Sequence, residues 1–424
     1  MKLRRTLVLL PIAVLAAGVA PPAAAAAPPG GSGCPQAPAP GAPVPPLAPR
    51  DPLITQLGLD AAWTLSTGKD VTVGVVDSGV DPSSPKLAGA VQPGLTFRTV
   101  NSPAVYKSSP GGETDCDGHG TEVAGVIAGR TAAEDDRVSG IAPDATIYPV
   151  AIQGDIGSAP SALIAAAIRA AAEHASVLNL SFAQTTDSPD IRAAIQFALG
   201  RDVVVVASAS NESGAASGGA GAKWYPAAYP GVLAVTSVDS TGAASDQTSS
   251  GSWISVAAPG DSLTTEPRGG KGFVTVSGTS FATAIVSGVA ALVRSRYPTM
   301  PAADVVALIE DTAVPPGDGR RDDEVGYGVV DPFAALTAPT GTSTSGAASP
   351  SAGHVPVRPL ARGGHSGGSQ AALWWTVALG AAAILVALGT LSVRSGRRRG
   401  WQAGPLAEAA ASGHEPEAHP AELG

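Results

Sequence analysis

Asp77, His119 and Ser280 supply the three kinds of side chain that an acyl-transfer site needs. Such a site combines a nucleophile, a base that takes its proton, and a carboxylate that orients the base and stabilises its cation. Histidine is the limiting residue type, because the chain has only six. Four of them lie in C-terminal stretches that cannot build a core, at His354, His365, His414 and His419. His119 and His174 are therefore the candidates for the base.

The surroundings of these two histidines differ. His174 ends an alanine-rich segment with helical character, where a cation is favoured by the helix dipole, so a structural role is expected for it. His119 stands between Gly118 and Gly120, which let the backbone turn sharply and leave the imidazole unobstructed. A turn histidine or a metal ligand is the alternative for His119. No second histidine or cysteine at ligand spacing supports a metal.

Ser280 occurs at the first turn of a segment built almost wholly from small and apolar residues, which runs to Tyr297 and stops before Pro298. A helix that is apolar on every side is expected to be buried. Gly288 in its middle costs roughly 1 kcal/mol relative to alanine, which predicts that another element packs closely there. A serine that caps this helix is the structural alternative to a nucleophile.

Asp77 follows the apolar run 71–76 and precedes Gly79, so by itself it has the character of a turn aspartate. Its place at the end of a candidate strand changes that interpretation when His119 and Ser280 are considered with it. An aspartate, a histidine and a serine in this chain order form one of the known arrangements of a catalytic triad.

The elements that must position these residues alternate along the chain. Strands are predicted at 71–76, 146–152, 177–180, 203–207 and 232–238. Helices are predicted at 120–129, 160–174, 190–199, 281–297 and 302–311, after a short helical segment at 51–65. This alternation predicts an α/β fold, a parallel sheet with helices on both faces. Its chemistry is expected beyond the carboxyl ends of the strands, where Asp77 lies.

Composition divides the chain into six predicted parts. They are a signal peptide at 1–26, a Pro-rich arm at 27–50, a catalytic domain at 51–337, a flexible linker at 338–370, a transmembrane helix at 371–393 and a cytoplasmic tail at 394–424. The first apolar run is short and contains Pro11, which disfavours the alternative of a retained anchor. The uncharged run at 371–393 is followed at once by arginines, which predict a cytoplasmic C-terminus and an extracytoplasmic catalytic domain. A buried soluble helix is the alternative for that run.

Charge and cysteine content narrow the possible partners. An apolar content of 44% with 14% charged residues excludes a disordered protein, and a net charge of -9 argues against nucleic acid as a partner. Cys34 and Cys116 are the only cysteines, and an exported pair is expected to form a disulfide; two free thiols are the alternative. No cofactor and no required metal are expected, because the acidic residues Asp135 and Asp136 have the character of a solvated loop.

Three sequence blocks resemble the signature blocks of the subtilisin-like serine proteases: 76–80, 118–121 and 278–282. The resemblance covers about residues 51–337, and it implies a subtilisin-like fold and endopeptidase activity on a protein or peptide substrate. It further implies that the Asn211 side chain belongs to the oxyanion hole, and that Ser181, Phe182 and Ala183 contribute to substrate binding. The chain departs from the family at Ser210 and Ala183, where glycine is usual, and at Ala284, where proline is common.

The combination of signal peptide, short arm, Cys116 within the histidine block and one C-terminal span resembles the mycosins. These are membrane-anchored proteases of actinobacterial type VII secretion systems, so the resemblance implies association with the secretion membrane complex and an arm pinned beside the cleft. A structural component that stabilises the complex, with proteolysis secondary, is the rival interpretation. A lipase-like hydrolase is disfavoured, because Ala282 stands where a nucleophile elbow needs glycine.

Overall fold

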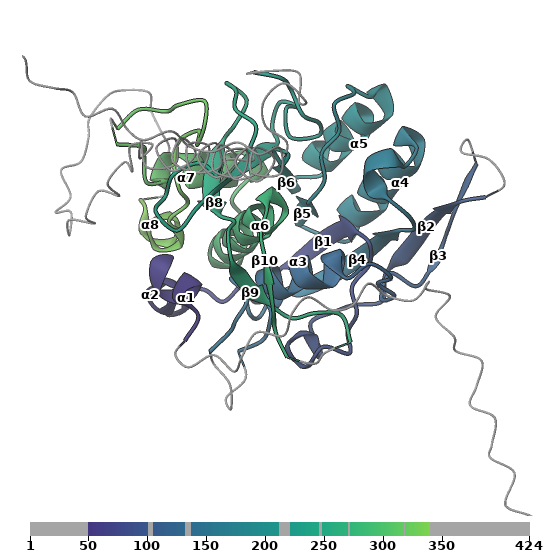
Figure 1. Ribbon diagram of the computed structural model, residues 1–424, viewed down its shortest axis with the longest axis horizontal. Helices are drawn as coiled ribbons and strands as arrows, with labels where there is room; N and C mark the ends of the chain where they lie inside the picture. The colour runs from purple at the N-terminus through teal and green to yellow at the C-terminus, as the bar shows by residue number, and fades with distance from the viewer. Residues whose placement is uncertain are drawn as a thin grey trace, which may run out of the picture. The chain divides into compact units, whose positions relative to one another are not determined.

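The computed structural model describes residues 50–100, 105–131, 137–211, 221–245, 248–269, 272–317 and 319–339 (Figure 1). All of them belong to the first of two compact units of the chain, residues 1–362. The predicted signal peptide, arm, linker, membrane span and tail lie outside the described residues. Within the described part of the chain, no helix is long and apolar enough to cross a membrane.

An eight-stranded sheet forms the centre of the fold, in the order β3-β2-β4-β1-β5-β6-β7-β8. Neighbouring strands pair in parallel, except for the antiparallel pair β2 and β3 at one edge. The strands are β1 (Thr72–Asp77), β2 (Leu95–Thr99), β3 (Tyr106–Pro110), β4 (Thr146–Ile152), β5 (Val177–Leu180), β6 (Val204–Ser208), β7 (Leu233–Val238) and β8 (Val256–Pro259). A separate antiparallel pair consists of β9 (Leu263–Thr265) and β10 (Val274–Val276).

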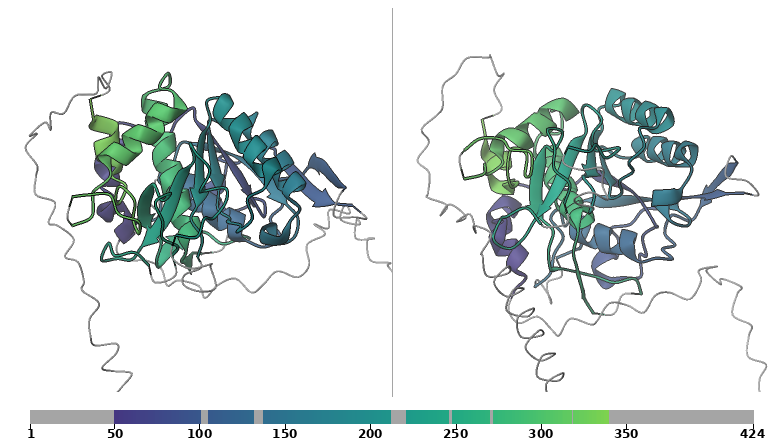
Figure 2. Two further views of the ribbon diagram at one scale, coloured as in Figure 1. Left: turned by 90° about the horizontal axis from the view of Figure 1, so that it is seen from above. Right: turned by 45° about the horizontal axis from the view of Figure 1, so that its top comes forward.

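Helices cover both faces of the sheet (Figure 2). They are α1 (Pro52–Gln56), α2 (Leu59–Trp63), α3 (His119–Ala128), α4 (Ser161–Ala172), α5 (Pro189–Gly200), α6 (Thr279–Arg296), α7 (Ala302–Thr312) and α8 (Pro332–Thr337), with short 3-10 turns at Pro85–Leu87 and Ile156–Ser158. Helices α4 and α5 bury one apolar cluster against the sheet, and α3, α6 and α7 bury another on the opposite face. The predicted α/β fold with a mainly parallel, doubly covered sheet is confirmed.

The side chains of a strand point alternately to the two faces of a sheet, and the central strands show why they must be apolar throughout. In β6, Val204 and Val206 pack into the cluster around α6, whereas Val205 packs into the cluster around α4 and α5. In β1, Val75 and Val76 divide between the two clusters in the same way. Continuous valine runs are therefore the sequence signal of strands that are covered on both faces.

Helix α6 runs through the interior, and 16 of its 18 residues are buried. Most of its side chains are small or apolar, as expected for a helix that is enclosed by other elements. A Cβ atom added to Gly288 would lie 2.5 Å from the Cβ of Ile141, so the close approach predicted at this glycine is confirmed. Ile141 belongs to the segment that leads into β4 and is itself fully buried.

Candidate active site

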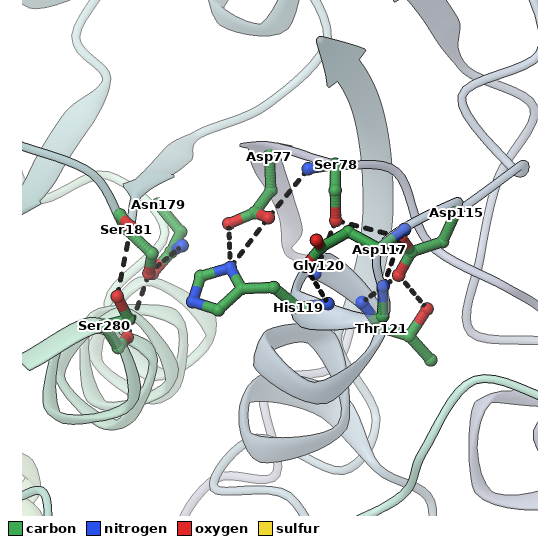
Figure 3. A network of polar contacts seen from close by, with 11 residues as sticks. Asp77, Ser78, Asp115, Asp117, His119, Gly120, Thr121, Asn179, Ser181 and Ser280 are labelled. Atoms are coloured by element: carbon green, nitrogen blue, oxygen red, sulfur yellow. Dashed lines mark hydrogen bonds and ion pairs between the residues drawn. The ribbon is translucent and has the colours of Figure 1, made fainter. Parts of the chain in front are cut away.

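The carboxyl end of β1 and the first turns of α3 and α6 carry the three candidate catalytic residues (Figure 3). Asp77 is the last residue of β1, His119 is the first residue of α3, and Ser280 is the second residue of α6. The imidazole of His119 lies between the carboxylate of Asp77 and the side of the site where Ser280 lies. Asp77 and Ser280, more than 200 positions apart in the sequence, thus both lie near the carboxyl end of β1.

The Asp77–His119 pair is formed in the structure. His119 Nδ1 lies 2.8 Å from Asp77 Oδ1 and 3.0 Å from Asp77 Oδ2. Asp77 is 4% exposed, and its Oδ1 also accepts a hydrogen bond of 2.7 Å from the backbone N–H of Ser78. Because Nδ1 is held by the carboxylate, Nε2 is the ring nitrogen left to exchange a proton with a substrate or a nucleophile.

The charge around the imidazole favours its protonated form. Burial lowers the pKa of His119, but the charge and hydrogen bond of Asp77, with smaller contributions from Glu122 and Asp117, outweigh it and raise the pKa to about 9. The His119 side chain is still 31% exposed, so water reaches one side of the ring. Burial raises the pKa of Glu122 to about 7; the charge of His119 opposes this shift, and the neighbouring carboxylates of Asp115, Asp117 and Asp77 add to it.

Asp115 builds the turn that presents His119, although the sequence did not single it out. Its Oδ1 accepts hydrogen bonds from Ser78 Oγ, Asp117 N and Gly118 N at 2.8–3.0 Å. Its Oδ2 accepts from Thr121 N and Thr121 Oγ1 at 2.9 and 2.5 Å. Asp115 is 4% exposed, so its carboxylate is buried together with the backbone N–H groups of Gly118 and Thr121. The available signal was its place just before a helix, where a carboxylate satisfies free N–H groups.

Because glycine has no Cβ atom, the start of α3 can pack directly against the end of β1. A Cβ at Gly120 would lie 2.0 Å from the carbonyl oxygen of Gly79 and 3.2 Å from Asp77 Cβ. Gly118 adopts a φ of 112°, a region that favours glycine. The glycines that flank His119 are therefore required by close backbone approach and by backbone conformation, in agreement with the sharp turn predicted from the sequence.

Ser280 does not cap its helix. The N-cap of α6 is Gly278, and the backbone N–H of Thr279 is satisfied by Asn211 Oδ1 at 2.7 Å. Ser280 Oγ instead donates a hydrogen bond of 3.1 Å to the carbonyl oxygen of Ser181. The capping interpretation of Ser280 is therefore wrong, because a neighbouring loop supplies the cap and leaves the serine hydroxyl free for other partners. Among the described residues, that hydroxyl makes no hydrogen bond to His119.

Asn211, which follows β6, lies against the first turn of α6, and its contacts with Thr279 set the orientation of its side-chain amide. Its Oδ1 accepts from both Thr279 N and Thr279 Oγ1, at 2.7 and 2.8 Å, and Thr279 Oγ1 also lies 2.6 Å from Ser208 Oγ. With the oxygen occupied in this way, Nδ2 is the side of the amide that is available as a donor. The preceding Ser210 has a φ of 90°, which explains why glycine is usual at that position.

The three predicted substrate-binding residues follow β5 directly. Ser181 and Phe182 are 6% and 7% exposed, and Ala183 is half-buried. Phe182 packs into the apolar cluster of α4 and α5, whereas Ser181 faces Ser280 (Figure 3). Phe281, the residue after Ser280, has its ring centroid 5.5 Å from that of His119.

Other predicted features fall outside this constellation. His174 is exposed just beyond α4 and stacks on Tyr148 with ring centroids 4.4 Å apart, so it is not part of the site. Cys34, and with it the predicted disulfide to Cys116, lies outside the described residues, as do Asp135 and Asp136. Over the described ranges, no group of three or more His, Cys, Asp or Glu residues is arranged to hold a metal ion.

Known proteins are similar to this chain in sequence and in fold. The model of the subtilase family, peptidase family S8, matches residues 68–328. Mycosin-4 of Mycobacterium tuberculosis (strain ATCC 25618 / H37Rv) is 34% identical over 393 residues, which cover 80% of this chain and 81% of the relative.

Two solved structures resemble the described fold. MycP1 from Mycobacterium smegmatis has a TM-score of 0.60 at 31% identity, covering 70% of this chain and 87% of that one. The periplasmic assembly from the ESX-5 inner membrane complex contains a chain with a TM-score of 0.62 at 29% identity, covering 76% of this chain and 92% of that one.

Proposed function

Because this chain belongs to the subtilase family of serine proteases, we propose that it is a membrane-anchored, extracytoplasmic endopeptidase of a type VII secretion system. We further propose Asp77, His119 and Ser280 as its catalytic triad. The observation that carries this assignment is the contact of His119 Nδ1 with both oxygens of the buried Asp77 carboxylate. This pair lies at the carboxyl end of β1, and Ser280 lies near it in the first turn of α6.

In the proposed reaction, Ser280 Oγ attacks the carbonyl carbon of the scissile peptide bond while its proton passes to His119 Nε2. Asp77 holds the imidazole by Nδ1 and stabilises the imidazolium. The C–N bond then breaks as Nε2 returns the proton to the leaving amine, and water repeats the sequence to release the acyl group. The Ser280 hydroxyl must first leave the carbonyl oxygen of Ser181, a rearrangement that substrate-free sites often require.

The negative charge of the tetrahedral intermediate needs donors, and we propose the Ser280 backbone N–H and the Asn211 side-chain amide for this role. Ser280 is the second residue of α6, so its backbone N–H has no partner within the helix and lies at the positive end of the helix dipole. Asn211 has its amide oxygen engaged by Thr279, which leaves Nδ2 as a donor. Removing one such donor costs about 10²–10³ in kcat, and an Asn211→Ala loss of that size would support this role.

Membrane anchoring and assembly with a secretion complex rest on the relatives and on the sequence. Mycosins are among the curated relatives, and one structural relative is described as part of an ESX-5 inner membrane complex. The uncharged run 371–393 would supply the anchor, with a cytoplasmic tail after it.

A Cys34–Cys116 disulfide would pin the N-terminal arm near His119 as a structural wrap. If the arm is only structural, cutting it after Pro49 should leave the rate of peptide hydrolysis nearly unchanged. A large gain in that rate would show that the arm inhibits the enzyme.

The similarity to a periplasmic assembly favours a second candidate role, a structural component that stabilises the complex. A Ser280→Ala protein expressed in a strain that lacks the gene separates the two. If proteolysis is the main role, secretion fails although the variant is present in the membrane at the normal level. Full restoration of secretion by the variant would favour the structural role. Loss of peptide hydrolysis by purified Ser280→Ala tests the triad itself.

A further inference from the structure

Two polar side chains lie deep in the contact between β5 and α6, where the surroundings are otherwise apolar. Asn179 on β5 and Ser287 on α6 are both fully buried. Asn179 occupies the middle of the sheet, in register with Val75 on one side and Val206 on the other. Burial of a carboxamide is costly unless it is hydrogen-bonded. The partners of Asn179 therefore indicate what it does.

These side chains form a continuous series of hydrogen bonds that ends at the candidate nucleophile. Ser287 Oγ donates to Asn179 Oδ1 at 3.0 Å, and Asn179 Nδ2 donates to Ser181 Oγ at 2.8 Å. Ser181 Oγ in turn donates to the carbonyl oxygen of Ser280 at 2.9 Å, and Ser280 Oγ donates back to the carbonyl oxygen of Ser181 at 3.1 Å. Figure 3 shows the part of this series from Asn179 to Ser280.

The periods of the two elements explain why the series fits. Ser280 and Ser287 are seven residues apart, two turns of α6, so they lie on the same helix face. Asn179 and Ser181 are two residues apart and therefore point to the same face at the end of β5. The helix is consequently tied to β5 at its first turn and again about 10 Å further along.

The donors and acceptors permit only one direction along the series. The main-chain oxygen of Ser280 can only accept a hydrogen bond. The Ser181 hydroxyl must therefore donate to it and accept from Asn179. Asn179 must then present Nδ2 to Ser181 and Oδ1 to Ser287, and the Ser287 hydroxyl must donate. Each bond thus fixes the orientation of the next, and the Ser287 hydroxyl completes the series by holding the oxygen end of the buried amide.

We propose that Asn179 and Ser287 are positioning residues for the nucleophile. They hold Ser181 so that its side chain and its carbonyl oxygen both form hydrogen bonds with Ser280. These two bonds set the position and the rotation of the first turn of α6 relative to His119. Neither residue touches the substrate or the reacting atoms. The proposal rests on the proposed function, because it assumes that Ser280 is the nucleophile.

Serine-to-alanine variants test this with little change in side-chain volume. Ser287→Ala leaves Asn179 Oδ1 without its donor, so the amide is held only through its bond to Ser181. We expect the kcat for peptide hydrolysis and the rate of Ser280 labelling by a fluorophosphonate to fall about threefold to tenfold at unchanged KM. Ser66→Ala is the matched control, because Ser66 is buried and donates 2.8 Å to Leu292 O on α6 but lies outside the series. It should lower Tm by a similar amount and leave kcat unchanged.

A double-variant cycle separates positioning from general destabilisation. Ser181→Ala removes the middle of the series, so adding Ser287→Ala to it should cost no further kcat, whereas independent effects would multiply. The proposal is overturned if Ser287→Ala leaves kcat and labelling at the Ser66→Ala level, or if the two losses multiply. Failure of the proposed function has a different signature, since wild-type protein would then not be labelled at Ser280.

Discussion

Glu122 lies one helical turn after His119 on α3, close enough for its charge to contribute to the raised pKa of the imidazole. The base must be neutral to accept a proton, so kcat/KM is expected to rise with pH and to level off above about 9. Glu122 itself titrates at about 7 and is ionised over the upper part of this range. Its charge therefore keeps part of the enzyme in the inactive, protonated form.

Glu122→Gln is expected to move the rising limb of the kcat/KM profile to lower pH. Partly exposed charge pairs are worth about 0.2–1 kcal/mol, so kcat/KM at pH 8 should increase by up to about fivefold. Glu173→Gln is the control, because it changes the net charge equally at an exposed position beyond α4. A limb that stays in place in Glu122→Gln, or that moves equally in both variants, would show that Glu122 does not act on His119.

Asp115 is the residue whose loss should most disturb the histidine turn. Asp115→Ala leaves the Gly118 and Thr121 N–H groups and the Ser78 hydroxyl without their acceptor, and each buried unsatisfied group costs about 1–3 kcal/mol. We expect a loss of several kcal/mol in unfolding free energy, measured by denaturant titration, together with a large loss of kcat. Asp117→Ala, at an exposed position two residues on, should stay within about 0.5 kcal/mol of wild type. Equal effects of the two variants would refute this role of Asp115.

Among the elements, α6 carries the proposed nucleophile and is closely packed at Gly288. Gly288→Ala brings a methyl group to within 2.5 Å of Ile141 Cβ, and overpacking of this kind costs about 1–3 kcal/mol, more than the gain in helix propensity of about 1 kcal/mol. We expect Tm to fall by a few degrees in calorimetry. Gly200→Ala, at the end of α5 with nothing within 4 Å of the added methyl group, is the matched control and should not lower Tm. A fall of the same size in both would point to a general intolerance of alanine.

The elements that sequence patterns predicted are those buried on both faces. Strands β4 and β5 match the predicted ranges, β7 begins one residue later than predicted, and β1 and β6 are each shifted by one residue. The agreement is close because runs of valine and isoleucine mark strands covered by helices. Strands β2, β3, β8, β9 and β10 were not predicted. All five residues of β3 are exposed, so no apolar pattern distinguishes it from a loop. The predicted helical segment 51–65 is divided into α1 and α2, with Gly58 at a φ of 58° between them.

The site was predictable to the extent that residue type and chain order determine it. Asp77 and His119 were paired correctly because a base needs a carboxylate and few histidines were available. Asp115 offered only its place just before a helix as a signal. The role of Asn179 was not predictable, because its hydrogen-bond partners depend on burial and on the packing of α6 against β5. The resting partner of Ser280 Oγ was missed for the same reason: it comes from a strand end 99 residues away.

For the described domain as a whole, activity and stability are expected to depend on pH in opposite ways. The pKa of His119 rises on folding from 6.5 to about 9, so the stabilisation from its pair with Asp77 is complete below pH 6.5 and is lost as pH rises through 9. The pKa of Glu122 is also raised, from 4.5 to about 7, which lowers stability as pH rises through that interval. Activity increases over the same range as His119 loses its proton.

Calorimetry on the Ser280→Ala protein tests this without self-digestion. Its Tm should be higher at pH 6 than at pH 9.5, while kcat/KM of the active protein should be higher at pH 9.5. His119→Gln removes the titrating imidazole and should flatten the part of the Tm profile between pH 7 and 9.5. A Tm that rises over this interval in the Ser280→Ala protein would contradict the assignment of the raised pKa to folding.

The enclosure of α6 also bears on how such a protease survives its own activity. A chain becomes a substrate only where its backbone can be drawn out as an extended strand, and segments without buried packing reach that state at the lowest cost. Helix α6, with 16 of 18 residues buried, reaches it only when the domain unfolds. Autolysis should therefore nick loops first and leave Ser280 on an intact helix, so that cleaved molecules keep a working nucleophile until the fold itself is lost.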